Sequence, residues 1–145
     1  MRNDILFNNF NLDHLLDELL LDIRSLLNCD AGSIYLEENN HLVFHIFQND
    51  SFNDKVPDEI FSLKLPLDKE EYIAVKAFKS KSIINIENIY ENTIFDFSAT
   101  KEIDKKLSYK SSNMLAIPLI DPEIKNTIGV LQLINKKDNK GEFVA

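Results

Sequence analysis

The chain has 145 residues, of which 44% are hydrophobic and 28% charged, and its formal net charge is −8. This length and composition predict one globular domain with a hydrophobic core of its own. Because acidic residues outnumber the scattered basic ones, we expect no nucleic-acid partner. The sequence has no apolar run long enough to cross a membrane and no signal-peptide pattern, which predicts a cytoplasmic protein without membrane insertion.

Cysteine and histidine residues give little support to thiol or metal chemistry. The one cysteine, Cys29, cannot form an internal disulfide and follows a leucine-rich segment, where we expect it to be buried. The three histidines, His14, His41 and His45, show none of the spacings of a zinc site. We therefore expect no metal site, and a packing or hydrogen-bonding role for His45.

The N-terminal segment predicts a long amphipathic helix. Asn11 has the side chain of an N-cap, and apolar residues then recur on one helical face at Leu12, Leu15, Leu16, Leu19, Leu20, Ile23, Leu26 and Leu27. Two interpretations of this stripe remain open. It either packs only on a sheet, or also forms a parallel homodimer interface together with Ile5, Leu6, Phe7 and Phe10.

Alternating apolar and polar residues predict a strand pair at residues 31–37 and 42–48. Strict alternation in the second strand places Phe44 and Phe47 on opposite faces of the sheet. The polar residues 49–59 then predict a loop.

The middle of the chain predicts shorter elements. We expect a strand at residues 61–67, a helix from Asp68 to about Lys79 and a strand at residues 82–86. Residues 87–109 are irregular but rich in apolar and aromatic side chains, which is typical of a segment that covers something. They predict either a cap over the sheet or a lid over a ligand cavity.

Two apolar segments, residues 113–120 and 127–136, predict an antiparallel hairpin at the centre of the sheet, covered on both faces. Gln132 is the polar residue in the middle of the second segment, so it either makes internal hydrogen bonds or faces a cavity. Taken together, the elements predict an α+β fold with a central antiparallel sheet of about five to six strands and helices on its faces.

In this order of elements the chain from about Leu12 onward resembles a GAF domain, the small-molecule sensory module found before histidine kinases, cyclases and phosphodiesterases. The resemblance is carried by residues 31–36 (AGSIYL), 83–90 (IINIENIY), 113–120 (NMLAIPLI) and 128–136 (IGVLQLINK). It implies that residues 1–145 are a single domain, an N-terminal part of a longer signalling protein whose C-terminal helix is missing. It also implies a covalently attached output domain.

The resemblance further implies a pocket between sheet and lid. The positions that match its ligand contacts are Ser33, Phe47, Ala74, Phe95, Phe97, Tyr109 and Gln132. An aromatic face at Phe47 suits a base, and the hydroxyl and amide groups of Ser33 and Gln132 suit its edge. Asn135 and Lys136 look like the start of the NK…F…DE signature of cyclic-nucleotide-type GAF domains, which implies that they help to lock the lid.

The sequence departs from the cyclic-nucleotide pattern in two places. Tyr72 and Val75 flank the helix start where relatives carry small residues, and Leu107 and Ser108 replace a Thr-Gly step before Tyr109. The ligand is thus left open between a cyclic nucleotide, another small molecule and none, and no other cofactor is expected.

Three functions follow from the resemblance. The first is a non-enzymatic sensor domain that controls an output domain by ligand binding and dimer rearrangement. The second is a structural dimerisation module with a vestigial pocket. The third is a free methionine sulfoxide reductase, a GAF-type enzyme that uses cysteines in the lid region, where this chain has none.

Overall fold

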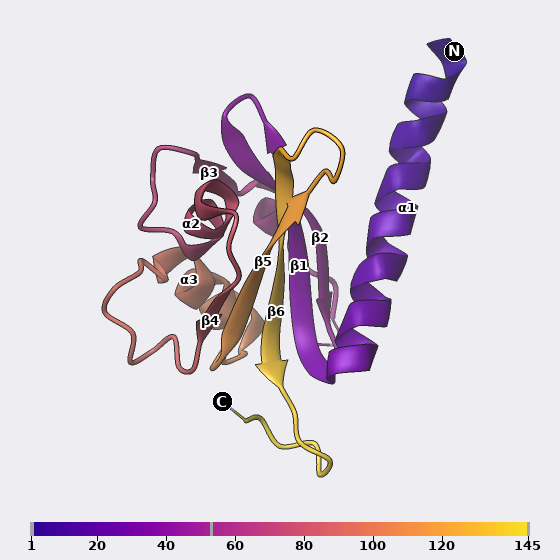
Figure 1. Cartoon of the computed structure of the whole chain (residues 1–145). Helices are drawn as coiled ribbons and strands as arrows, with labels where there is room; N and C mark the ends of the chain where they lie inside the picture. The colour runs from indigo at the N-terminus through magenta and orange to yellow at the C-terminus, as the bar shows by residue number, and fades with distance from the viewer. Residues whose placement is uncertain (1, 53, 145) are drawn as a thin grey trace.

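One antiparallel sheet of six strands separates two layers of helices (Figure 1). The computed structural model describes residues 2–52 and 54–144, with side chains from Leu12 onward. The strands are β1 (Cys29–Glu38), β2 (His41–Asn49), β3 (Lys64–Pro66), β4 (Ile84–Ile86), β5 (Met114–Ile120) and β6 (Thr127–Lys136), in the order β3-β2-β1-β6-β5-β4. The helices are α1 (Arg2–Leu27), η1 (Asp58–Ser62, a 3₁₀ helix), α2 (Ile73–Ser80) and α3 (Ser98–Leu107). The predicted α+β fold and the predicted hairpin, β5–β6, are confirmed.

Helix α1 lies against one face of the sheet, and α2 and α3 lie on the other (Figure 1). Helix α1 begins at Arg2, earlier than the predicted start at Asn11. That residue and the apolar positions before it lie outside the part of the chain whose side chains are described. Leu16, Leu20 and Ile23 pack on the sheet, whereas other leucines of the stripe are exposed: Leu12, Leu15, Leu19 and Leu26. The sheet therefore uses only part of the apolar stripe.

The side chains of neighbouring β1 residues pack in two separate hydrophobic clusters, one on each face of the sheet. Ile34 joins a small cluster beneath α1, and Tyr35 joins a larger cluster beneath α2 and α3. Because successive side chains of a strand point to opposite faces, a sheet that is covered on both sides needs such two-faced strands. The apolar segment of β6 meets the same need, with Leu131 and Leu133 on the α1 side and Val130 and Ile134 on the other.

A β-bulge in the β1–β2 pair corrects one prediction. Ile34 pairs with Ile46, but the next residue of β1, Tyr35, pairs with Phe44, so His45 is the extra residue. An extra residue reverses the alternation of the bulged strand beyond it. Phe44 and Phe47 therefore pack in the same core, not on opposite faces as predicted.

The segment between β2 and β4 differs from the prediction. The expected strand at residues 61–67 is replaced by the end of η1 and the short β3. Helix α2 starts at Ile73, and its N-cap is Tyr72, which makes no side-chain capping bond, so Asp68 is not the helix start. The irregular segment, hereafter the lid (residues 87–109), contains α3, and it connects β4 to β5 over the sheet face opposite α1.

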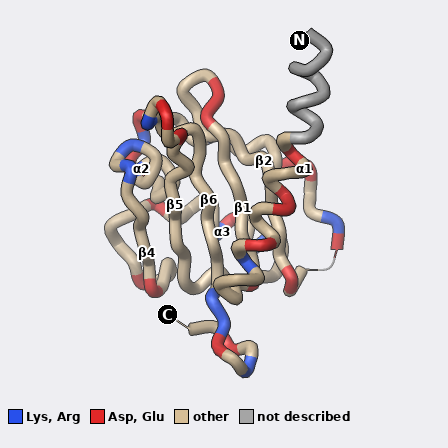
Figure 2. Tube along the Cα trace, turned by 45° about the vertical axis from the view of Figure 1, so that its right-hand side comes forward, with Lys and Arg blue, Asp and Glu red and all other residues tan. Residues whose placement is uncertain are grey.

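Along the described backbone, the Lys and Arg positions are spread over several segments and alternate with Asp and Glu positions (Figure 2). Acidic residues are spaced along α1, at Asp13, Asp17, Glu18 and Asp22. In the described part of the chain, no helix is apolar over a stretch that could span a lipid bilayer.

Candidate functional site

A cavity of about 30 Å³ lies between the lid and the sheet. It is lined by Ala31, Ser33, Tyr35, Phe44, Phe47, Asn49, Thr100, Ile103, Asp104, Leu107, Tyr109, Ser111, Gln132 and Ile134. The floor comes from β1, β2 and β6 and the roof from α3 and the end of the lid. A volume of this size accommodates a water molecule, whereas pockets for drug-sized ligands measure roughly 300–1,000 Å³.

Four of the seven predicted ligand contacts line this cavity: Ser33, Phe47, Tyr109 and Gln132. The other three do not. Ala74 is buried in α2 within the larger core, and Phe95 and Phe97 pack against that core with their ring centroids 6.3 Å apart. Their assignment as ligand contacts therefore remains a prediction, which would require the lid to move.

The floor of the cavity carries a pair of buried polar side chains. Ser33 and Gln132 are directly opposite each other on β1 and β6. The Ser33 hydroxyl donates to Oε1 of Gln132 over 3.4 Å, and both residues are almost fully buried. Gln132 thus makes an internal hydrogen bond and also lines the cavity, so it combines the two alternatives that the sequence left open.

Sequence reasoning missed a third polar group of the floor. The buried Nδ2 atom of Asn49 has no hydrogen-bond partner within the described residues. An unpaired buried donor is costly, so an acceptor in the cavity would stabilise it. Asn49 was predicted to lie in a loop because the predicted strand ended at residue 48, whereas β2 extends to Asn49 and places it on the same face as Phe47.

Asp104 holds the roof of the cavity together. Its buried carboxylate accepts hydrogen bonds from the hydroxyl of Ser111 at 2.7 Å, from the backbone N–H of Ser111 at 2.8 Å and from the Tyr90 hydroxyl at 2.7 Å. Burial and this bond to Asp104 raise the pKa of Tyr90 to about 12. Of the described residues that line the cavity, none is basic, so no lining residue offers a positive charge to a phosphate.

Asn135 ties the end of the lid to β6. Its Nδ2 donates to the Tyr109 hydroxyl and to the Lys110 carbonyl, both at 2.8 Å, and its Oδ1 accepts from the backbone N–H groups of Ser112 at 2.6 Å and Asn113 at 3.2 Å. These bonds join β6 to the end of the lid, and the lid-locking role of Asn135 stays a prediction. Lys136 differs, because its Nζ donates to the Leu27 carbonyl at the end of α1, 2.9 Å away.

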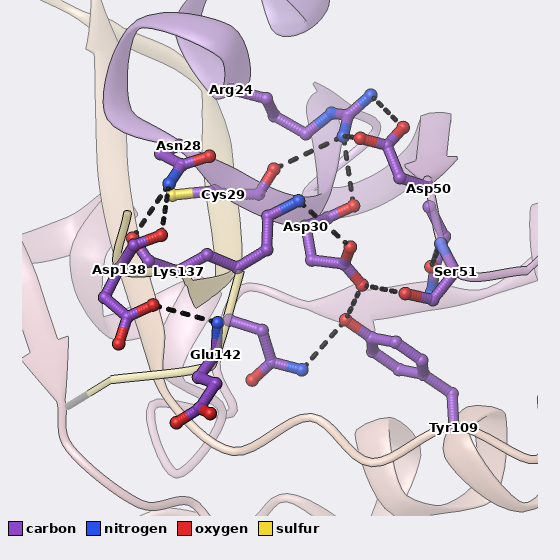
Figure 3. Close-up of polar contacts among 12 residues, drawn as sticks. Arg24, Asn28, Cys29, Asp30, Asp50, Ser51, Tyr109, Lys137, Asp138 and Glu142 are labelled. Atoms are coloured by element: carbon purple, nitrogen blue, oxygen red, sulfur yellow. Dashed lines mark hydrogen bonds and ion pairs between the residues drawn. The ribbon is translucent and has the colours of Figure 1, made fainter. Parts of the chain in front are cut away.

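Tyr109 connects the cavity to a second buried carboxylate (Figure 3). Its hydroxyl donates to Asp30 Oδ2 at 2.7 Å. Burial raises the pKa of Tyr109 well above its usual range, and the hydrogen bond to Asp30 adds to this effect. At neutral pH the phenol is therefore a stable donor.

The remaining candidate groups lie elsewhere. Cys29 is buried, as predicted, in the cluster beneath α1, where burial raises the pKa of its thiol. His45 has the predicted hydrogen-bonding role, with Nε2 2.6 Å from Glu38 Oε2 and Nδ1 3.5 Å from Asp13 Oδ1. Within the described residues, no three His, Cys, Asp or Glu side chains are grouped closely enough to hold a metal ion.

Comparison with known proteins gives a family match over most of the chain and a similar protein. A family profile described as GAF domain matches residues 11–144. The cGMP-specific 3',5'-cyclic phosphodiesterase of Drosophila melanogaster is 29% identical over 143 residues, which are 94% of this chain and 12% of that protein. The chain thus spans about one eighth of the length of this relative.

Two solved structures show the same fold. The GAF domain of a phosphoenolpyruvate-protein phosphotransferase from Coxiella burnetii superposes with a TM-score of 0.65 at 16% identity and covers 90% of this chain and 73% of that one. A Staphylococcus aureus NreA protein mutated in its nitrate binding site gives a TM-score of 0.63 at 20% identity, covering 94% of this chain and 91% of that one.

Proposed function

The chain belongs to the GAF domain family, and we propose that it is a regulatory domain that binds a small molecule between sheet and lid and thereby controls an attached output domain. The observation that carries this proposal is the polar cavity. Ser33, Asn49 and Gln132 converge from three strands on a space that Tyr109 closes from the lid. Pockets that bind small molecules combine apolar walls with a few such convergent polar groups.

The phosphodiesterase relatives make cGMP the first ligand to test. Its entry requires the lid to move, because the cavity of about 30 Å³ is far smaller than a nucleotide pocket. Three basic side chains in or directly after the lid have partners outside the cavity. Lys101 and Lys110 lie over the Tyr90 ring, and Lys106 is paired with Glu59 at 3.0 Å. A phosphate would thus compete for lysines that already have partners, and small planar ligands such as nitrate belong in the same screen.

Isothermal calorimetry and thermal unfolding with cGMP, cAMP, nitrate and methionine sulfoxide test the proposal. We expect one of these ligands to raise the melting temperature of the chain, because binding to the native state alone stabilises it. Ser33→Ala should weaken that binding, whereas the matched control Ser82→Ala, in an exposed turn, should not. Binding that is unchanged by Ser33→Ala would place the ligand outside the cavity.

We further propose that the domain has no enzymatic activity of its own and is cytoplasmic. Cys29 belongs to the cluster on the α1 side of the sheet and does not line the cavity. A thiol that attacks a sulfoxide in the cavity must reach it. Reduction of free methionine sulfoxide by the purified chain would contradict this proposal.

The exposed leucines of α1 favour the second candidate function, a dimerisation module. Leu26 is 83% and Leu15 59% exposed, and on a helical wheel they share one flank of α1 with Leu12 and Leu19. An exposed apolar stripe of this kind suits a homodimer through residues 12–27. We expect light scattering to give a dimer mass for the wild type and a monomer mass for Leu15→Glu. A dimer that binds no ligand in the screen would favour this function over the sensor.

A further inference from the structure

Tyr109 takes part in two environments at once. Its ring lines the cavity, while its hydroxyl lies in the polar cluster at the end of α1 (Figure 3). In that cluster the hydroxyl donates to Asp30 Oδ2 at 2.7 Å and accepts from Asn135 Nδ2 at 2.8 Å. Any movement of the lid that displaces this ring must therefore also break contacts outside the cavity.

Asp30 is the residue that receives the contact. It is 3% exposed, and its carboxylate also accepts from the Ser51 hydroxyl at 2.7 Å and lies 3.5 Å from Nζ of Lys137. A buried carboxylate is stable only while it has enough donors. Loss of Tyr109 would leave it with one hydroxyl and one distant ammonium group.

Arg24 links the same residue to α1. This side chain is 4% exposed, and its Nη1 donates to the backbone carbonyls of Asp30 at 3.0 Å and of Cys29 at 3.3 Å. The rest of the guanidinium is held on β2 and the loop after it, by Gln48 at 2.9 Å and Asp50 at 3.3 Å. Arg24 therefore fixes the end of α1 to the strand residue whose carboxylate the lid contacts.

The segment after β6 joins the same cluster. The backbone N–H of Lys137 donates to the carbonyl of Asn28, directly after α1, at 2.8 Å, and the Asn28 side chain donates back to the carbonyls of Lys137 and Asp138 at 2.9 and 3.2 Å. Since the Lys137 ammonium also pairs with Asp30, this residue contacts Arg24 of α1 through its backbone carbonyl and the chain that leaves the sheet through its carboxylate.

We propose that Tyr109 is a positioning residue that couples the state of the lid to the end of α1 and to the segment after β6, through Asp30, Arg24 and Lys137. This inference rests on the proposed function, because it assumes that a ligand moves the lid. When the lid closes, the Tyr109 hydroxyl donates to the Asp30 carboxylate. This bond holds the start of β1 in the position in which Arg24 can bond the Asp30 carbonyl. When the lid opens, the carboxylate of Asp30 loses this donor. The contacts of Arg24 at the end of α1 and of Lys137 after β6 then loosen together.

Hydrogen exchange followed by NMR on the full chain tests the coupling without any ligand. The reporter amides are Lys137 N–H, which donates to Asn28, and Asp50 N–H, which donates to Asp30. We expect Tyr109→Phe to speed their exchange by about tenfold relative to β6 amides, the size expected for loss of a hydrogen bond to a charged group. Tyr90→Phe is the matched control, because it removes an equal 2.7 Å bond that stays within the lid, between Tyr90 and Asp104.

A second substitution separates coupling from a general loosening of the fold. In an Arg24→Lys background, Tyr109→Phe should no longer affect the Asp50 amide, because the guanidinium contacts that join α1 to Asp30 and Asp50 are already cut. If Arg24→Lys does not fold, Asp30→Asn serves the same purpose. Additive effects in either background, or equal effects of Tyr109→Phe and Tyr90→Phe, would overturn the inference.

The ligand experiment reports on the proposed function separately. Failure of cGMP and the other ligands to bind the wild type counts against the sensor and leaves the exchange result standing. If cGMP binds, the exchange at Lys137 should change on saturation with cGMP in the wild type, and Tyr109→Phe, saturated at its own affinity, should lose this change. A variant that binds cGMP and still shows the full change would contradict the coupling.

Discussion

Asn135→Ala should be among the most destabilising single substitutions in this domain. The residue is 0% exposed, and its amide satisfies three backbone groups at the end of the lid: the Lys110 carbonyl and the N–H groups of Ser112 and Asn113. Each buried backbone group left without a partner costs at least about 1 kcal/mol, which gives about 3 kcal/mol in total.

Backbone conformation adds to this cost. Asn135 has φ 60°, a left-handed conformation that Asn tolerates better than Ala, and the substitution therefore costs about 1 kcal/mol more. The sum is about 4 kcal/mol, a large fraction of the roughly 5–15 kcal/mol by which domains are stable. We expect a clear fall in the urea midpoint at an unchanged slope.

Asn39→Ala is the control for the backbone contribution. Asn39 also has a left-handed backbone, φ 51°, but its side chain is exposed in the turn between β1 and β2. We expect this variant to lose only about 1 kcal/mol of unfolding free energy. If Asn135→Ala falls within 1 kcal/mol of Asn39→Ala, the hydrogen bonds of Asn135 do not hold the lid, and the reasoning is refuted.

Three further predictions concern the core, a titrating group and the helix. Gly129→Ala should lower the free energy of unfolding by about 3 kcal/mol in urea, because its Cβ would clash with a backbone carbonyl of β1; an unchanged midpoint would refute this. The pKa of Tyr90, raised to about 12 by burial and its bond to Asp104, predicts a stabilisation that is complete below pH 10 and lost between pH 10 and 12. Absorbance titration should show this ionisation, and Tyr90→Phe should remove it. Leu20→Ala should cost about 2–5 kcal/mol, since the side chain is fully buried, whereas Leu26→Ala should leave monomer stability within about 0.5 kcal/mol.

Much of the sheet could be predicted because its strands carry strong local patterns. The apolar segments 113–120 and 127–136 indicated β5 and β6 nearly to the residue. The bounds of the short strands were harder to predict, since β3 and β4 have three residues each and too little sequence pattern to define where they begin and end. Helix α2 starts without a side-chain cap, so its sequence offered Asp68 as a false start.

Four residues that the family resemblance implied line the cavity, and for two of them the regular alternation of a strand indicates the same face. Ser33 and Gln132 sit in regular parts of β1 and β6, and both line the cavity as expected. Asn49 was missed because the predicted strand ended at residue 48, one residue short of the end of β2. Asp30 was not among the predicted site residues, and its partners Tyr109 and Lys137 are far from it in sequence, so only the fold brings them together.

The sheet topology has a consequence for synthesis of the chain. β1 is a central strand with β2 on one side, joined by a tight turn, and β6 on the other, about 100 residues further along. Contacts of such large sequence separation form slowly because a long loop must close first. On the ribosome, β1 therefore has one unpaired edge until residues 127–136 have emerged. During that interval the nascent chain exposes an apolar edge to other chains, and chaperone demand should be highest just before its last strand appears.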